Sequence, residues 1–380
     1  MSAEIPTDLI GRLKRNHLVP TLRRRVRTAA ALLRWHFRAF SDLVAADGLS
    51  DRRRLLVIYD FSSQPFSIGD ILVIQEASLV LRQVAGVDRV DLALVYDPAS
   101  PVVPDPAFSQ IGSENFLWHL PTVLQAAQVN PHLGSLFLFD SHRRLEEFAS
   151  GNLDIYDVWP PLLQYANREY LYYRVFNEVL FDYFQREKAL PRLQLRSPAR
   201  AWSRAFIERH VGSDVPVTVQ IRRNPTNPER DTHSDSWISF FQFSLGRYPV
   251  KFLIICAQHE VDARLRQCPN VIVAKDHCTN VEQDLALVDA AAIHMGASSG
   301  PGVIAIFNDK PYCQFNTNLQ LDRYRGSMLE GNRGRLFFSK STQSFLFGRE
   351  TPDLIAEEFE RMWKVIEPSH SGDRPRSTQA

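Results

Sequence analysis

The stretch Asp284-Leu-Ala-Leu-Val-Asp-Ala-Ala-Ala-Ile-His-Met-Gly-Ala-Ser-Ser-Gly-Pro-Gly302 decides the fold, together with Lys310-Pro-Tyr-Cys-Gln-Phe-Asn316. Its pattern predicts a helix, an apolar strand over residues 292–295, a turn of small residues and a second helix, before another strand over 312–315. Residues 296–302 carry no bulky side chain, so a ligand can approach their backbone closely. The turn also opens a helix, whose free N–H groups and positive dipole end favour an anion. Ligands bind at the carboxyl edge of open parallel sheets, so this turn is the first candidate for a site.

The same residues match a second pattern, G-x-S-x-G, which is typical of the nucleophile elbow of α/β-hydrolases, with Ser298 as the nucleophile. A hydrolase needs an acid and then a histidine further along the chain. The only histidine after Ser298 is His370, within a stretch whose composition is typical of a disordered tail. The hydrolase is therefore the less favoured alternative, and a tight turn without any chemistry is a further one.

Length and composition limit the class of protein. A chain of 380 residues suits two domains of ordinary size, and 44% hydrophobic residues can fill their cores. A net charge of +1 argues against a general nucleic-acid binder. The four cysteines include no C-x-x-C pair, so a zinc ribbon is not expected, and scattered thiols fit a reducing cytoplasm. The sequence holds no apolar run long enough to span a membrane and no signal-peptide core at its N-terminus.

We expect residues 1–53 to form a basic helical extension. Between Leu9 and Phe40 there are nine Lys or Arg residues and no Asp or Glu. Apolar residues recur there at roughly helical spacing with arginines opposite, a pattern typical of an amphipathic helix that lies on an anionic lipid surface. A solvated helix that packs on the protein's own core is an equally good interpretation. We expect a cytoplasmic protein, with peripheral attachment to the inner face of the membrane as the added hypothesis.

The rest of the chain predicts an α/β fold with two Rossmann-like domains that face a cleft. Buried strands alternate with helices over residues 54–195 and again, more regularly, over 196–350. This alternation predicts parallel sheets with right-handed crossovers. A capped helix over 351–366 is expected to cross back to the first domain. Residues 367–380 are expected to be a disordered tail.

A basic loop, Gln220-Ile-Arg-Arg-Asn-Pro-Thr-Asn-Pro-Glu-Arg-Asp-Thr-His-Ser-Asp235, follows the first strand of the second domain. Arg222 and Arg223 stand at the end of a buried strand, so we expect their guanidinium groups at the ligand-binding edge of the sheet. An arginine can bind a diphosphate through two parallel hydrogen bonds. In a parallel sheet, these arginines and the Ser298-Ser299 turn share one edge. Two arginines that bridge to the first domain are the alternative.

Together, the two Rossmann-like halves, the basic loop, the G-x-S-S-G-P helix opening and the closing helix resemble a GT-B glycosyltransferase. The resemblance is to the fucosyltransferase-like and bacterial surface-polysaccharide type. Those enzymes often carry H-x-R-R-x-D where this chain has Gln220-Ile-Arg-Arg-Asn-Pro225, so the arginines match but the leading His and trailing Asp do not. The architecture covers residues 54–366, and the motifs lie within 217–225 and 282–316.

The resemblance implies a nucleotide-sugar donor that is bound mainly by the C-terminal domain. Arg222 and Arg223 would stabilise the charge of the leaving diphosphate, with Asn224 beside them in the donor site. Glu282 or Asp284 would meet the ribose or the base, although acids at a helix start are often only partners of the helix dipole.

The turn supplies the rest of the implied donor site. Ser298, Ser299 and the N–H of Gly300 would hold phosphate or ribose oxygens. Such enzymes usually need no metal, and we expect neither a metal nor a cofactor besides the nucleotide-sugar substrate. The acceptor would be a saccharide or a lipid-linked saccharide that approaches from the N-terminal domain.

An inverting transferase also needs a base that takes the acceptor's proton. Asp70, in the loop that opens the first helix of the N-terminal domain, is the preferred candidate, and a helix N-cap is its alternative role. Asp60, at a strand end, and His142 are the next candidates. The rival function is a nucleotide- or sugar-binding protein without turnover, which would use the same turn only to hold its ligand.

Overall fold

The computed structural model describes residues 53–97, 116–162, 165, 171–224 and 228–371. The basic extension, apart from residue 53, lies outside these ranges, as do residues 372–380 of the expected tail. The chain divides into two compact units, each assembled from separate stretches of sequence. The first unit combines residues 1–64, 82–102 and 132–170, and the second combines 65–81, 103–131 and 171–380. The domain limits expected from the sequence, 54–195 and 196–350, follow the chain continuously instead, and they stay a prediction.

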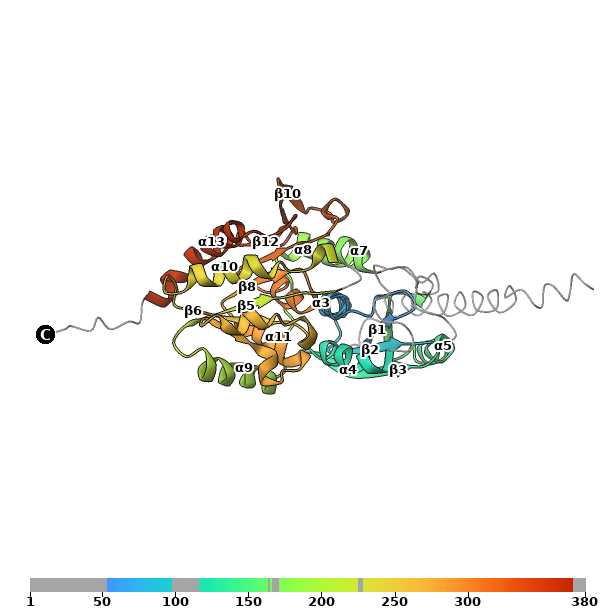
Figure 1. The fold of residues 1–380 in the computed structure, drawn as a ribbon. Helices are drawn as coiled ribbons and strands as arrows, with labels where there is room; N and C mark the ends of the chain where they lie inside the picture. Colours follow the sequence, from blue (N-terminus) through green and yellow to red (C-terminus); the bar gives the residue numbers. More distant parts are fainter. Residues whose placement is uncertain (1–52, 98–115, 163–164, 166–170, 225–227, 372–380) are drawn as a thin grey trace, which may run out of the picture. The chain divides into compact units, whose positions relative to one another are not determined.

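The first unit contains a four-stranded parallel sheet with the strand order β3-β2-β1-β4 (Figure 1). Its strands are β1 (Arg54–Asp60), β2 (Val90–Val95), β3 (Leu133–Phe139) and β4 (Tyr156–Trp159). Helix α5 (His142–Gly151) packs Leu145 and Ala149 into the same core as Leu56 and Ile58 of β1. Since the buried run at 54–60 has no polar alternation, it forms a strand that is covered on both faces.

The second unit contains an eight-stranded sheet, of which six strands run parallel in the order β7-β6-β5-β8-β9-β12. They are β5 (Val215–Gln220), β6 (Val250–Ile255), β7 (Val271–Val273), β8 (Ile293–Ala297), β9 (Tyr312–Phe315) and β12 (Gln343–Leu346). Numbered along the chain, this is the order 3-2-1-4-5-6 of the Rossmann fold. The α/β prediction with Rossmann-like parallel sheets is confirmed.

An antiparallel extension of this sheet was not predicted from the sequence. Strands β10 (Met328–Glu330) and β11 (Arg333–Arg335) form a short hairpin that pairs with β12 at the edge of the sheet. Each has only three residues, too few to show a period of hydrophobic side chains.

Four longer helices cover the second sheet: α9 (Ser197–His210), α10 (Ser234–Ser244), α11 (Val281–Ala290) and α13 (Pro352–Ser371). Figure 1 shows α10 and α13 on one side of the strands and α9 and α11 on the other. Trp237 of α10 and Phe359 of α13 join Phe252 of β6 in one buried core. Helix α13 runs beyond the expected end at residue 366, and its expected crossing to the first domain stays a prediction.

The start of helix α3 (Ile68–Ala85) shows which residue is its N-cap. An N-cap was the alternative role expected for Asp70, and this alternative is wrong. The hydroxyl of Ser67 accepts hydrogen bonds from the backbone N–H groups of Gly69 and Asp70, at 3.1 and 3.4 Å. Ser67 is therefore the N-cap, and Asp70 lies within the first turn. The helix carries an almost continuous run of buried residues from 71 to 80.

The remaining helices include one of 12 residues, α4, and several shorter ones. They are α4 (Phe116–Ala127), α7 (Tyr172–Arg174), the π-helix η2 (Val175–Leu180), α8 (Phe181–Glu187) and α12 (Val303–Ile306), with 3₁₀ turns η3 (Pro228–Arg230), η4 (Gln258–Glu260), η5 (Ala263–Gln267), η6 (Ala274–His277), η7 (Gly300–Gly302) and η8 (Leu321–Arg323).

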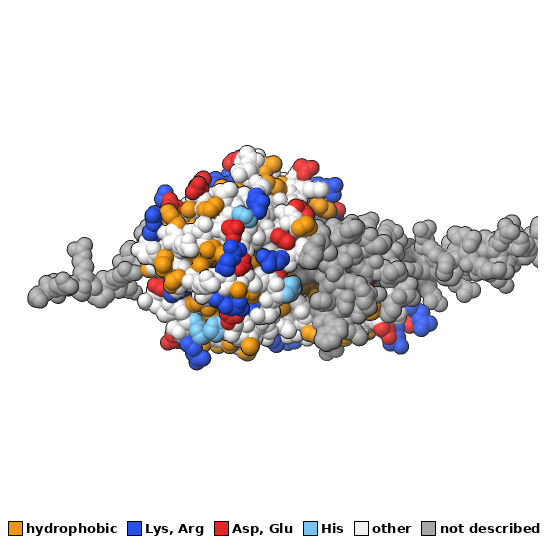
Figure 2. Space-filling model, viewed as in Figure 1, with side chains coloured by type: hydrophobic (Ala, Val, Ile, Leu, Met, Phe, Trp, Pro, Cys, Tyr) orange, Lys and Arg blue, Asp and Glu red, His pale blue; other side chains and the backbone are white. Residues whose placement is uncertain are grey.

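Basic and acidic side chains are interspersed on the face of the second unit that Figure 2 shows. Ion pairs account for part of this mixture, such as Arg264 with Asp235 and Arg266 with Asp276, each with 2.6 Å between nitrogen and oxygen. No helix within the described ranges is both long and apolar enough to cross a lipid bilayer.

Gly296 is the glycine on which the second sheet depends most directly. Its φ of +115° lies where other residues are strained, and a Cβ atom there would be 2.2 Å from the carbonyl oxygen of Gln220. We predict that Gly296→Ala lowers the free energy of unfolding by about 2–6 kcal/mol, from backbone strain and overpacking together.

Urea denaturation would measure this loss, with Gly86→Ala as the matched control. Gly86 also has a positive φ, +65°, but a Cβ atom there meets nothing within 4 Å. The control should lose only about 1–2 kcal/mol, the cost of the left-handed conformation. Equal losses in the two variants would show that the contact with Gln220 does not matter.

Candidate functional site

The second sheet reverses its strand order between β5 and β8, and ligands of such sheets bind at the carboxyl end of this point. Gln220, the last residue of β5, pairs with Gly296 of β8. Arg222 and Ser298 each follow two residues later and thus emerge at the same edge. The sequence analysis expected these two segments to share an edge, and the strand pairing places them there.

Arg222 is buried, with 6% of its surface exposed. Its Nη1 donates to Oδ1 of Asp231 at 2.7 Å, and its backbone N–H donates to the hydroxyl of Thr232 at 2.9 Å. The same Asp231 oxygen accepts the N–H of Asn224 at 2.8 Å. Burial lowers the pKa of Arg222, while the charge of Asp231 acts in the opposite direction. These hydrogen bonds therefore connect residues 222–224, at the start of the basic loop, with residues 231–232 near its end.

Arg230 is the arginine that contacts the small-residue turn. Its Nη2 donates to the backbone carbonyl of Ser298 at 2.6 Å. Burial, followed by the positive charge of Arg222, lowers the pKa of Arg230, whereas Tyr172 and Asp70 are among the groups that raise it. The sequence analysis missed Arg230, although it lies in the same loop as Arg222. Its position in a loop at the sheet edge, which already contained Arg222, could have identified Arg230 as a candidate.

The glycines of the turn serve protein packing, which corrects the expectation that they leave room for a ligand. A Cβ atom at Gly300 would lie 2.8 Å from Cβ of Ile68 and 3.0 Å from the backbone N of Gly69. A Cβ atom at Gly302 would lie 2.6 Å from Nε2 of Gln314. The helix that follows is also short, with η7 and then α12 ending at Ile306. Side chains are thus better placed than a helix dipole to supply charge here.

Asp70 lies next to this turn within the second unit. Its neighbour Gly69 is packed against Gly300, since a Cβ atom on Gly69 would be 3.4 Å from Cα of Gly300. The carboxylate is half-buried, and its charge acts on Arg230, Tyr172 and Tyr324. Asp70 and Arg230 therefore both lie near residues 298–300.

Other candidate donor residues have partners inside the protein. Glu282 forms two hydrogen bonds with Arg196, each 2.6 Å long. Asp284 is buried and accepts from Lys275 and Thr279, each at 2.6 Å. Their proposed roles at a ribose or base would require these pairs to open. Arg223 is exposed, and its backbone N–H donates to Glu260 at 3.0 Å.

The hydrolase alternative receives no geometric support from the turn. Nucleophile elbows place the serine on a strained turn. Ser298 is not among the described residues with a positive φ, which are Lys188, Cys278 and Asn316 besides glycines. Ser299 has extended backbone angles of −149° and 165°.

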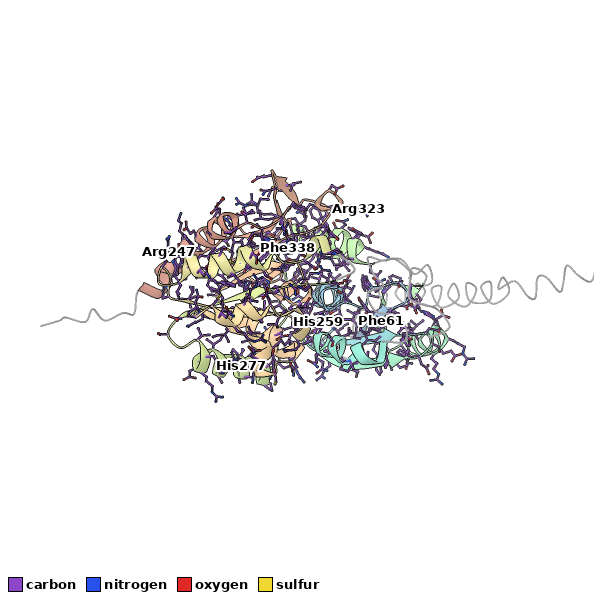
Figure 3. The ribbon with its side chains drawn as sticks, viewed as in Figure 1. Phe61, Arg247, His259, His277, Arg323 and Phe338 are labelled. Carbon is purple, nitrogen blue, oxygen red and sulfur yellow. The ribbon has the colours of Figure 1, made fainter. Side chains whose placement is uncertain are left out.

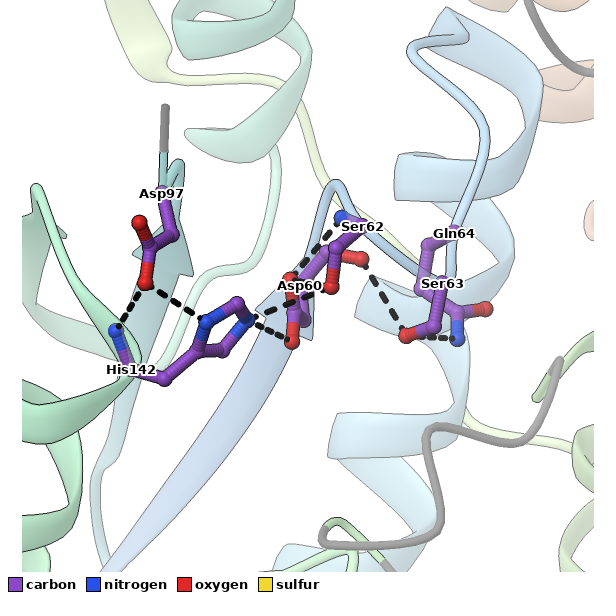
Figure 4. A network of polar contacts seen from close by, with 6 residues as sticks. All are labelled: Asp60, Ser62, Ser63, Gln64, Asp97 and His142. Carbon is purple, nitrogen blue, oxygen red and sulfur yellow. Dashed lines mark hydrogen bonds and ion pairs between the residues drawn. The ribbon is translucent and has the colours of Figure 1, made fainter. Parts of the chain in front are cut away.

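A second polar cluster lies at the carboxyl edge of the first sheet (Figure 4). His142 stands between two carboxylates, with its Nε2 2.8 Å from Oδ2 of Asp60 and its Nδ1 2.8 Å from Oδ2 of Asp97. Asp60 also accepts from the N–H and the hydroxyl of Ser62, at 2.9 and 2.7 Å. Asp60 and His142 were both predicted as candidate bases, and the structure brings them together. Asp97 and Ser62 were missed, although each closely follows the end of a strand.

The ring of His142 thus contacts a carboxylate oxygen at each of its two nitrogens. Burial raises the pKa of Asp60, but the hydrogen bond and charge of His142 and the bonds from Ser62 outweigh it, so that the pKa lies below its usual value.

Among the described residues, no group of three or more His, Cys, Asp or Glu side chains is arranged to hold a metal ion.

No protein-family model matches the chain, and no curated protein does either. Solved structures with a similar fold include the ADP-heptose LPS heptosyltransferase II of E. coli, at 10% identity and a TM-score of 0.47, which covers 83% of this chain and 99% of the other. Another is a family 9 glycosyl transferase of Veillonella parvula DSM 2008, at 13% identity and a TM-score of 0.48, with 84% and 98% covered. Both are glycosyltransferases, the class that the sequence motifs resemble.

The cluster around His142 leads to a prediction about stability. Asp60→Asn removes one carboxylate from a buried charged pair, which should cost about 3–5 kcal/mol of unfolding free energy at neutral pH. Asp140→Asn is the control, because its ion pair with Arg144 is 63–65% exposed and should contribute less than about 1 kcal/mol. Chemical denaturation would compare the two. A loss in Asp60→Asn as small as in the control would show that the contact between Asp60 and His142 contributes little to stability.

Proposed function

We propose that this protein is a glycosyltransferase that moves a sugar from a nucleotide-sugar donor to a saccharide acceptor. One observation carries the proposal: two arginines, Arg222 and Arg230, and one carboxylate, Asp70, meet at the switch point of a Rossmann-ordered sheet. Such a transfer needs cations for the leaving diphosphate and a base for the acceptor's hydroxyl. Arg222, Arg230 and Asp70 would provide both kinds of group beside one turn.

On the donor side, Arg230 and Arg222 neutralise the charge that develops on the diphosphate. The hydroxyls of Ser298 and Ser299 and the N–H of Gly300 donate to phosphate or ribose oxygens. Because Arg230 is already bound to the carbonyl of Ser298, its guanidinium is held in place before the donor arrives. Arg223 and Asn224 extend this donor site, and the cationic side chains make a metal unnecessary in the mechanism.

On the acceptor side, Asp70 takes the proton of the attacking hydroxyl. Ser67 caps helix α3, so Asp70 is not needed for that role. Asp60 lies in the cluster around His142, in the first unit, whereas Asp70 lies in the second unit beside the turn that follows β8. The acceptor is a saccharide or a lipid-linked saccharide, which would explain a basic N-terminal segment that meets an anionic membrane.

The donor site predicts a loss of transition-state stabilisation in Arg230→Ala. Removing a charge-assisted contact of this kind costs on the order of 2–4 kcal/mol, so kcat/KM should fall by about 30- to 1000-fold. A thermal-shift panel of UDP, GDP, ADP, CMP and their sugars would first select the donor, because a bound ligand raises the melting midpoint. Arg209→Ala, an exposed arginine of α9, is the control. Equal activity of both variants would remove Arg230 from the mechanism.

Asp70→Asn separates an enzyme from a protein that only binds its ligand. The amide keeps the shape of the carboxylate but cannot take a proton, so kcat should fall by about 10²- to 10⁴-fold. The nucleotide-sugar should still raise the melting midpoint as in the wild type. Asp154→Asn, on an exposed turn, is the control. Absence of sugar transfer in the wild-type protein itself, with donor binding intact, would favour the non-catalytic binding protein.

The basic segment over residues 9–40 lies outside the described residues and leads to a test of its own. Each basic residue near an anionic surface contributes about 1 kcal/mol, so binding to vesicles should be reversible and weaken with salt. Sedimentation with vesicles of phosphatidylcholine, with and without phosphatidylserine, would compare the full chain with one that starts at Asp51. Equal sedimentation of the two chains would leave the lipid-linked acceptor without support.

A further inference from the structure

A π-helix interrupts the helical run that starts the C-terminal part of the second unit. Helix α7 passes into η2, Val175–Leu180, and then into α8; Figure 1 labels α7 and α8. π-Helices are rare and occur frequently at functional sites, because the extra residue per turn redirects the side chains around it. Here the side chains in question are aromatic.

We call Tyr172, Tyr173, Phe176 and Tyr324 the aromatic cluster. The ring of Tyr324 lies 6.2 Å from that of Tyr172, 5.4 Å from that of Tyr173 and 5.1 Å from that of Phe176, measured between centroids. Phe176 and Tyr324 are buried at 2% and 4% exposure, whereas Tyr172 and Tyr173 are half-buried. The two outer tyrosines therefore rest on a fixed aromatic base and reach the surface.

Asn177 of the π-helix fixes the loop that carries Tyr324. Its side-chain amide donates to the carbonyl of Arg323 at 2.7 Å and accepts from the N–H of Arg325 at 2.8 Å. The two bonds bracket Tyr324 in the sequence and hold its backbone. Arg323, labelled in Figure 3, places its guanidinium 5.3 Å from the centroid of Tyr173. The outer face of the cluster is thus ordered before any ligand binds.

The aromatic cluster adjoins the candidate active site. Phe176 stacks at 6.2 Å on Phe307, which caps the short helix after the turn, and Phe307 stacks at 5.5 Å on Phe338, labelled in Figure 3. Burial and then the charge of Asp70 raise the pKa of Tyr172. Burial, its tyrosine neighbours and Asp70 raise the pKa of Tyr324 as well. The phenols therefore stay protonated and donate hydrogen bonds at neutral pH.

The chemistry of this surface fits a sugar ring better than a nucleotide. A pyranose presents an apolar face of C–H groups and a rim of hydroxyls, which suit a tyrosine ring and a nearby carboxylate acceptor. A diphosphate would be repelled by the charge of Asp70, and its own cationic partners are Arg222 and Arg230, of which Arg230 is bound to the carbonyl of Ser298. The neighbourhood of Asp70 is where the hydroxyl to be deprotonated must lie.

We propose that Tyr172, Tyr173 and Tyr324 form a subsite for a pyranose ring of the acceptor and present one of its hydroxyls to Asp70. The role of this subsite as an acceptor site rests on the proposed function. The binding of a sugar ring to it can be tested separately. The ring would stack on Tyr173, while Tyr324 and Arg323 hold that tyrosine in place.

The test is saturation-transfer difference NMR on the full chain with the methyl pyranosides of glucose, galactose and mannose as probes. At least one probe should receive saturation at its ring C–H protons from the wild-type protein. Tyr173→Ala should bind that probe about tenfold more weakly, the scale of a lost aromatic contact, while Tyr173→Phe keeps the ring and stays within about twofold. The matched control is Tyr183→Ala, since Tyr183 is also half-buried, lies on α8 and has Arg186 6.0 Å from its ring centroid.

Each outcome is decisive for the subsite. No saturation of any probe by the wild type, or equal binding by Tyr173→Ala and Tyr183→Ala, would overturn it. A nucleotide-sugar thermal shift that is unchanged in Tyr173→Ala would show that the variant is folded. Saccharide binding through Tyr173 without any sugar transfer would keep the subsite and overturn the proposed function. Sugar transfer whose acceptor KM is the same in Tyr173→Ala would keep the function and overturn the subsite.

Discussion

The close contact of β8 with β5 at Gly296 is the constraint on which the second unit depends. These two strands are the first and fourth of the Rossmann order, and the chain turns to opposite faces of the sheet after them. Any side chain at Gly296 would run into the backbone of Gln220 and separate the strands. Arg222 and Ser298 follow Gln220 and Gly296 by two residues each, so the pairing of these two strands sets how close Arg222 and Ser298 lie. Arg230 then closes the edge with its bond to Ser298.

The turn after β8 shows how a ligand-like motif can be used for packing. Small residues permit close approach, but the groups that approach Gly300 and Gly302 belong to Ile68, Gly69 and Gln314. This packing brings the start of α3 to the turn and therefore brings Asp70 with it. The glycines thus assemble the site by drawing protein segments together, and the arginine side chains supply its charge.

Asp60 and Asp70, the two carboxylates considered as the catalytic base, have different surroundings. Asp60 is enclosed by Ser62 and His142, and the ionic bond to the histidine favours its charged form. Asp70 stands in the first turn of a helix that Ser67 already caps, beside Arg230 and two tyrosines. The first arrangement stabilises a sheet edge, whereas the second leaves a carboxylate next to groups that can bind a substrate.

The sequence by itself determined the α/β class, the strands at 54–60 and 312–315, and the parallel alternation, because hydrophobic period and strand length are local properties. It also placed Arg222 and the Ser298 turn at one edge, since strand ends share an edge in any parallel sheet. Only the tertiary structure decided that Arg230 contacts Ser298, that Asp97 joins Asp60 across His142, and that Tyr324 packs against Tyr172. Each of these pairs is distant in sequence. Crossover connections and packing between distant segments bring these residues together. A local sequence pattern contains no information about such contacts.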